Sequence, residues 1–90
     1  MKTKFQELFG DSVRVQILEF FLETNGIAFP VEAIIEDKSI GKSQTYEIIN
    51  DFVNKKYLNV IKDGNRNKYF LNTNNQIIRN LKLIFKKVVI

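Results

Sequence analysis

The period of the hydrophobic pattern changes near Leu58, and this change constrains the fold more than any other feature of the sequence. Before Leu58, apolar residues such as Ile48, Ile49 and Phe52 recur three and four residues apart, as in an amphipathic helix. After it, residues 58–61 and 68–71 alternate as strands do, with Asp-Gly between them. The pattern predicts a helix over about 43–56 and then a β-hairpin, with segment 62–67 as a loop longer than a two-residue turn.

Helical spacing also predicts helices over 3–9, 13–24, 31–37 and 74–89. Asp11 or Ser12 is placed to cap the second of these, with Glu19 on its polar side, and Pro30 suits the first turn of the third. Residues 27–29 are too few for more than a short strand or extended linker. The sequence therefore predicts one α+β domain over 1–90, with its core in 11–72.

The sequence contains no Cys and no His. These absences exclude disulfides, thiol nucleophiles, the commonest general base and the commonest metal ligand. There is also no glycine-rich phosphate loop and no clustered pair of carboxylates. We therefore expect no enzyme activity, no metal site, no cofactor and no small-molecule ligand. Because no long apolar segment is present, we expect a cytoplasmic protein that does not enter a membrane.

The net charge of +4 hides a strong polarity along the chain. Residues 1–54 hold five Lys or Arg and nine Asp or Glu, for a net charge of −4. Residues 55–90 hold nine Lys or Arg and only Asp63, for a net charge of +8. A basic half on a small domain is typical of proteins that bind polyanions, and a solvated lysine-rich surface is the alternative.

Taken in order, these segments resemble the winged helix-turn-helix transcription regulators of the ArsR/MarR-like group, in archaea and bacteria. The resemblance covers residues 8–72 and rests on the residues at 8–18 (LFGDSVRVQIL), 40–46 (IGKSQTY) and 62–71 (KDGNRNKYFL). It implies a three-helix core, a two-stranded wing and an additional C-terminal helix. Lys56 departs from the pattern, because such proteins usually have Gly where the recognition helix ends.

The resemblance implies a sequence-specific double-stranded DNA-binding regulator. Helix 43–56 would enter the major groove, where polar side chains near its start read base edges. Gln44 and Asn50 suit adenine, Glu47 suits cytosine, and Tyr46 suits a thymine methyl or a phosphate. A polar face that meets only water is the alternative. The candidate contacts of this helix are Lys42, Ser43, Gln44, Tyr46, Glu47 and Asn50.

Segment 62–68 is the expected wing, placed on the DNA backbone or in the minor groove. This segment has a net positive charge, because it holds three cationic residues and only one acid, Asp63. The excess of positive charge favours contact with phosphates over a hairpin tip that serves only solubility. The candidate contacts of the wing are Lys62, Asn65, Arg66 and Lys68.

The last predicted helix has an apolar stripe wider than one small domain covers. We expect it to form a homodimer interface, alone or together with helix 3–9, and packing onto its own domain is the alternative. A twofold dimer predicts half-sites about one helical turn apart. The candidate interface residues are Ile77, Leu81, Ile84, Phe85 and Val88.

Acidic residues in the front half argue against simple DNA binding. Glu32, Glu36 and Asp37 precede the recognition helix, and Glu47 and Asp51 lie on it. A second hypothesis follows, in which the chain is a winged-helix protein–protein module of transcription, replication or segregation machinery.

Overall fold

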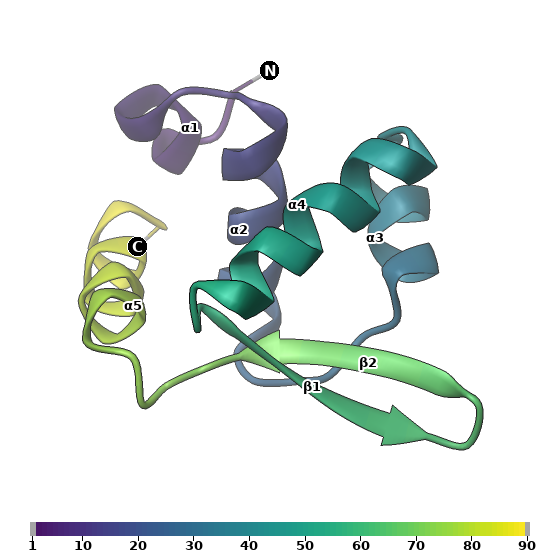
Figure 1. Ribbon diagram of the computed structural model, residues 1–90. Coiled ribbons are helices and arrows are strands. Elements are labelled where there is room, and N and C mark those ends of the chain that lie inside the picture. Colours follow the sequence, from purple (N-terminus) through teal and green to yellow (C-terminus); the bar gives the residue numbers. More distant parts are fainter. Residues whose placement is uncertain (1, 90) are drawn as a thin grey trace.

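The computed structural model describes residues 2–89, which form five helices and one antiparallel hairpin (Figure 1). The α+β class is confirmed, and every predicted helix is present with its bounds shifted by a few residues at most. The elements are α1 (Lys4–Phe9), α2 (Val13–Thr24), α3 (Val31–Lys38), α4 (Lys42–Asn54), β1 (Leu58–Asp63), β2 (Arg66–Leu71) and α5 (Gln76–Val89).

Helices α2, α3 and α4 surround a core of aliphatic and aromatic side chains. Ile17 of α2, Ile34 of α3 and Ile49 of α4 are fully buried. The predicted cap of α2 is present, since the Ser12 hydroxyl accepts a hydrogen bond from the Val15 N–H at 3.2 Å. Ile40 is buried in the turn between α3 and α4, so the turn is held against the same core.

The hairpin is longer and its turn tighter than the sequence predicted. Strand pairing continues to Asp63 opposite Arg66, leaving only Gly64 and Asn65 to connect the strands. The prediction of a six-residue loop was therefore wrong. Polar residues such as Lys62 and Asn67 looked like loop residues, but both faces of the hairpin tip meet solvent, so strand residues there need no apolar alternation. Gly64 has a φ of +66°, as two-residue hairpin turns require.

The short segment before α3 pairs with the wing. Phe29 exchanges two backbone hydrogen bonds with Tyr69 of β2, at 2.9 and 2.8 Å. Within segment 27–29, Phe29 thus forms an isolated bridge, in agreement with the predicted short strand or linker. This bridge ties β2 to the start of α3 and so sets the hairpin beside α3 and α4.

Helix α4 ends without the usual glycine. Lys56 itself takes the left-handed conformation, with a φ of +68°. The Lys56 N–H donates to the Val53 carbonyl and the Tyr57 N–H to the Phe52 carbonyl, which together make a Schellman motif. The rings of Phe52 and Tyr57 complete it with a contact of 5.9 Å between centroids. The absence of Gly therefore leaves the form of the helix exit unchanged.

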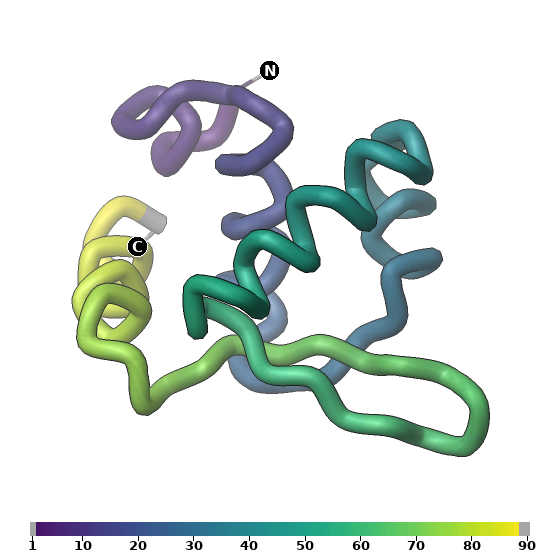
Figure 2. Tube along the Cα trace, in the orientation of Figure 1, coloured from purple at the N-terminus to yellow at the C-terminus, as the bar shows by residue number. Residues whose placement is uncertain are grey.

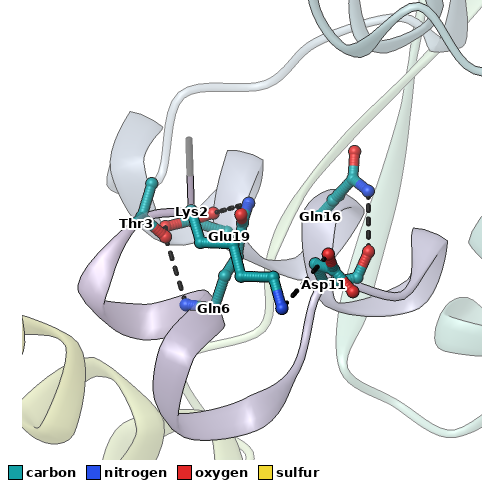
Figure 3. Close-up of polar contacts among 6 residues, drawn as sticks. All are labelled: Lys2, Thr3, Gln6, Asp11, Gln16 and Glu19. Atoms are coloured by element: carbon teal, nitrogen blue, oxygen red, sulfur yellow. Dashed lines mark hydrogen bonds and ion pairs between the residues drawn. The ribbon is translucent and has the colours of Figure 1, made fainter.

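Helices α1 and α5 pack together at one side of the molecule, and the hairpin projects at the other (Figures 1 and 2). Phe5 of α1 is buried, and its ring meets that of Phe85 of α5 at 5.6 Å. Glu19 does not lie on a solvent-exposed side of α2 as predicted, because it is 1% exposed. Its carboxylate accepts hydrogen bonds from the Thr3 hydroxyl at 2.7 Å and the Gln6 amide at 2.8 Å (Figure 3). This buried acid attaches the N-terminal segment to α2.

Candidate nucleic-acid interface

One side of α4 presents polar side chains to solvent. Ser43, Gln44, Glu47 and Asn50 are exposed, as predicted for base-reading residues, and Lys42 is exposed at the first position of the helix. The helix starts there because Gly41 is its N-cap, and the buried Thr45 hydroxyl donates to the Gly41 carbonyl at 2.8 Å. Thr45 therefore orients the first turn from inside.

The cationic side chains of the hairpin differ in whether they form ion pairs within the protein. Lys68 forms an ion pair with Asp63 on the facing strand, with 2.7 Å between Nζ and Oδ2. This pairing lowers the pKa of Asp63 through the hydrogen bond from Lys68 and the charge of its ammonium. Lys62 is exposed and has no ion pair among the described residues. Lys62 is therefore better placed than Lys68 to contact a phosphate.

Glu32 connects α3, α4 and the wing. One carboxylate oxygen accepts a hydrogen bond from the Tyr46 hydroxyl at 3.0 Å, and the other pairs with the Arg66 guanidinium at 3.1 Å. These three residues line a surface cavity of about 460 Å³, together with Val31, Asn65, Asn67 and Tyr69. The structure thus brings Tyr46, Asn65 and Arg66 together, although the first is on the helix and the others are in the wing.

The electrostatics of this cluster follow from its hydrogen bonds. The pKa of Glu32 is lowered by its own backbone N–H, by Arg66 and by Tyr46, all of which favour the ionised carboxylate. Conversely, the hydrogen bond to Glu32 raises the pKa of the Tyr46 hydroxyl, because the phenol must keep its proton to donate it. At neutral pH the cluster therefore consists of a carboxylate, a neutral phenol and a guanidinium.

A second acidic residue of the interface is also neutralised. Asp51 of α4 pairs with Arg14 of α2 at 2.6 Å and with Lys55 at 3.0 Å. Hydrogen bonds from these two cations lower the pKa of Asp51. Arg14 also lies 5.7 Å from the centre of the Phe52 ring. Nothing local in the sequence indicates that Arg14 borders the candidate interface, because Arg14 and Asp51 are 37 residues apart in the chain.

A shallow groove lies where α2 meets α4. Its volume is about 320 Å³, and it is lined by Ser12, Val13, Arg14, Gln44, Glu47 and Ile48. Two predicted base-reading residues, Gln44 and Glu47, thus flank the start of α2. Asn50 lies outside this groove and outside the cavity at Glu32.

The apolar stripe of α5 divides into two parts. Leu81, Phe85 and Val88 pack against the chain's own core beside the fully buried Ile78. The other two predicted interface residues face solvent, since Ile77 is 55% exposed and Ile84 is 37% exposed. Leu83 of α5 and Leu8 and Phe9 of α1 are exposed as well.

Two further features bear on function. Across residues 2–89, the acidic side chains do not gather into a group of three that could hold a metal ion. None of the helices that the structure describes is both long enough and apolar enough to cross a membrane.

Comparisons with known proteins point to one fold. Neither a protein-family model nor a curated protein matches the chain. Among solved structures, it is similar to the homodimeric winged helix-turn-helix DNA-binding domain of Mb0332 from Mycobacterium bovis, a possible ArsR-family transcriptional regulator. That match has a TM-score of 0.66 and 15% identity, and covers 94% of this chain and 74% of the other. Rv0081 of M. tuberculosis matches with a TM-score of 0.66 and 20% identity, covering 94% and 81%. The chain therefore has the winged helix-turn-helix fold, with α3 and α4 as its helix-turn-helix and β1–β2 as its wing.

Proposed function

We propose that this protein is a cytoplasmic transcription regulator, of the ArsR/MarR-like kind, that binds double-stranded DNA in a sequence-specific manner. Helix α4 enters the major groove, and the wing contacts the backbone or the adjacent minor groove. The similarity to the Mb0332 domain, which is a DNA-binding domain, supports this function.

The observation that carries the proposal is the link from α4 to the wing through Glu32. Tyr46 and Arg66 both contact this one carboxylate, so the base-reading helix and the cationic hairpin border the same surface. A duplex that meets α4 therefore also meets the wing. Without an adjacent cationic element, the polar face of α4 would be equally consistent with a surface that meets only water.

Each part of the surface has its own role. Asn50 and Gln44 form bidentate contacts to adenine, and Glu47 accepts from cytosine. Lys42 and Lys62, both exposed, contact phosphates and provide attraction without sequence preference. The pairing of Asp51 with Arg14 and Lys55 removes part of the acidic repulsion that argued against DNA binding.

The regulator acts as a homodimer through α5 and α1. The exposed apolar area for that interface comes from two helices: Ile77, Leu83 and Ile84 of α5, and Leu8 and Phe9 of α1. Leu81, Phe85 and Val88 support it from beneath by holding α5 on the core. The homodimeric state of the Mb0332 domain supports the same assembly.

Duplex binding is tested with labelled DNA selected from a random library, over a series of salt concentrations. We expect log affinity to fall linearly with log salt. Asn50→Ala should relax the preference at one or two base positions, by about 1–3 kcal/mol per position. Lys62→Ala should weaken binding to selected and random duplexes alike and reduce the salt slope by about 1.

Two results would contradict the proposal. Equal effects of Asn50→Ala and Lys62→Ala on selected and random duplexes would remove α4 from the recognition role. Weak binding that does not depend on salt would instead support the protein–protein module.

The dimer is tested by sedimentation of Ile77→Lys against Ile27→Lys as a matched control. Both residues are well exposed, at 55% and 60%, but Ile27 lies in the connection between α2 and α3. We expect the first variant to be monomeric and the second to remain dimeric. A monomeric wild type would refute the assembly.

A further inference from the structure

We infer that Tyr46 and Arg66 form a binding site for one DNA backbone phosphate, and that Glu32 occupies this site in the free protein as an intramolecular competitor. The inference rests on the proposed DNA-binding function and assigns Glu32 a role in setting affinity.

The two donors come from different elements and converge on one acceptor. The Tyr46 hydroxyl and the Arg66 guanidinium each bind one oxygen of the Glu32 carboxylate, at 3.0 and 3.1 Å. Arg66 is separated from Glu32 by 34 residues along the chain, so only the fold places them together. The bridge between Phe29 and Tyr69 holds β2 against the start of α3 and maintains this arrangement.

The chemistry of the donors matches a phosphate as well as it matches a carboxylate. A guanidinium presents N–H donors in a planar fork that pairs with two oxygens of either group, and a phenol adds one more donor. The carboxylate of Glu32 therefore stands in for two oxygens of a phosphate. The cavity beside it, of about 460 Å³, leaves room for a phosphate and its flanking sugar.

The exchange of one anion for the other is feasible because the existing pair is held weakly. The side chains of Arg66 and Glu32 are 59% and 55% exposed, and ion pairs of this kind contribute little to stability. A duplex brings many phosphates at once, so the exchange at Arg66 is driven by the other contacts of the interface. Because the phosphate must first displace Glu32, the free energy of this ion pair is subtracted from the free energy of DNA binding.

Removing the competitor should therefore strengthen DNA binding. Glu32→Gln abolishes the charge of the carboxylate while keeping its size. Glu36→Gln is the matched control, because Glu36 is an exposed acid on the same helix with no ion pair among the described residues. It removes the same unit of charge without freeing Arg66.

We expect Glu32→Gln to bind duplex about threefold more tightly than Glu36→Gln at the same salt concentration, as release of one exposed ion pair implies. In an Arg66→Ala background, the two substitutions should have equal effects, because the site has lost its principal cation. Equal affinities of Glu32→Gln and Glu36→Gln in the wild-type background would overturn the inference and leave the proposed function intact. Weaker binding by Glu32→Gln would also overturn it, since Glu32 would then be positioning Arg66 for DNA.

A second measurement, made without DNA, tests whether Glu32 occupies the site in the free protein. The pKa of Tyr46 is raised by its hydrogen bond to Glu32, so in an ultraviolet titration of the phenols Tyr46 should ionise above the ordinary pKa of a tyrosine. Glu32→Gln should return that tyrosine toward its ordinary pKa and Glu36→Gln should not, with Tyr46→Phe assigning the signal. An unchanged titration in Glu32→Gln would show that Glu32 does not hold the site. Absence of duplex binding by every variant, with the titration as expected, would instead refute the proposed function.

Discussion

Replacing Lys56 with Gly is expected to stabilise this protein, although it removes a side chain. Lys56 follows α4 in the left-handed conformation, where its Cβ is strained against the backbone. Its N–H and that of Tyr57 close the Schellman motif, so the chain cannot leave this conformation without losing two hydrogen bonds. Glycine would form the same motif without the strain.

The magnitude follows from two opposing effects. Relief of the left-handed strain contributes about 1–2 kcal/mol. The greater freedom of Gly in the unfolded chain opposes this by about 0.5–1 kcal/mol. The Lys56 side chain is exposed and forms no ion pair within residues 2–89, so its loss adds little. From the midpoints of the two ranges, the net gain is about 0.75 kcal/mol, which raises the Tm of a domain of this size by about 3–6 °C.

Thermal unfolding followed by circular dichroism measures this gain, with Lys56→Ala as the control. The alanine variant loses the same charge but keeps the strained Cβ, so its Tm should stay close to that of the wild type. Lys56→Asn should lie between alanine and glycine, since Asn tolerates the left-handed region better than most residues. A glycine variant no more stable than the alanine variant would refute the argument from backbone strain.

Three further predictions concern stability. Glu19→Ala should lower the free energy of unfolding by about 2 kcal/mol in urea titrations, because the Thr3 and Gln6 side chains lose their hydrogen-bond acceptor. Glu7→Ala on the exposed side of α1 should change this free energy little. Gly64→Ala should lower it by about 1 kcal/mol, because the turn requires a positive φ, and a neutral result would contradict the turn geometry. The pKa of Asp51 is lowered in the folded state, so its ionised carboxylate stabilises the fold above the unfolded pKa of about 4, and this stabilisation is lost as pH falls through the folded pKa. Asp51→Asn should therefore flatten the acid limb of a curve of unfolding free energy against pH, measured with urea.

Much of the fold was predictable because its signals are local. The helices of this chain are marked by apolar residues three and four positions apart, and Ser12 caps α2 as its residue type predicts. The hairpin was predicted from alternation around Asp-Gly, but its turn was not. Strand pairing near the tip depends on the facing strand, and the polar residues there carry no local sign of it.

The candidate interface was predictable as a set of residue types and not as a set of partners. Ser43, Gln44, Glu47 and Asn50 are exposed as the helical period implies. The period also placed Tyr46 beside the outward face, yet nothing local to it indicates that its hydroxyl binds Glu32.

The sequence by itself determined the order of the elements, the polar side of α4 and the uneven distribution of charge, because each depends on residues that are close along the chain. Only the tertiary structure decided which charges are neutralised. Glu32 meets Arg66 across 34 residues and Arg14 meets Asp51 across 37, so both pairs exist only once the wing and α2 are packed against the helix-turn-helix. Tertiary packing likewise buried Glu19 and divided the apolar stripe of α5 between the core and the surface, since burial depends on what lies opposite a side chain.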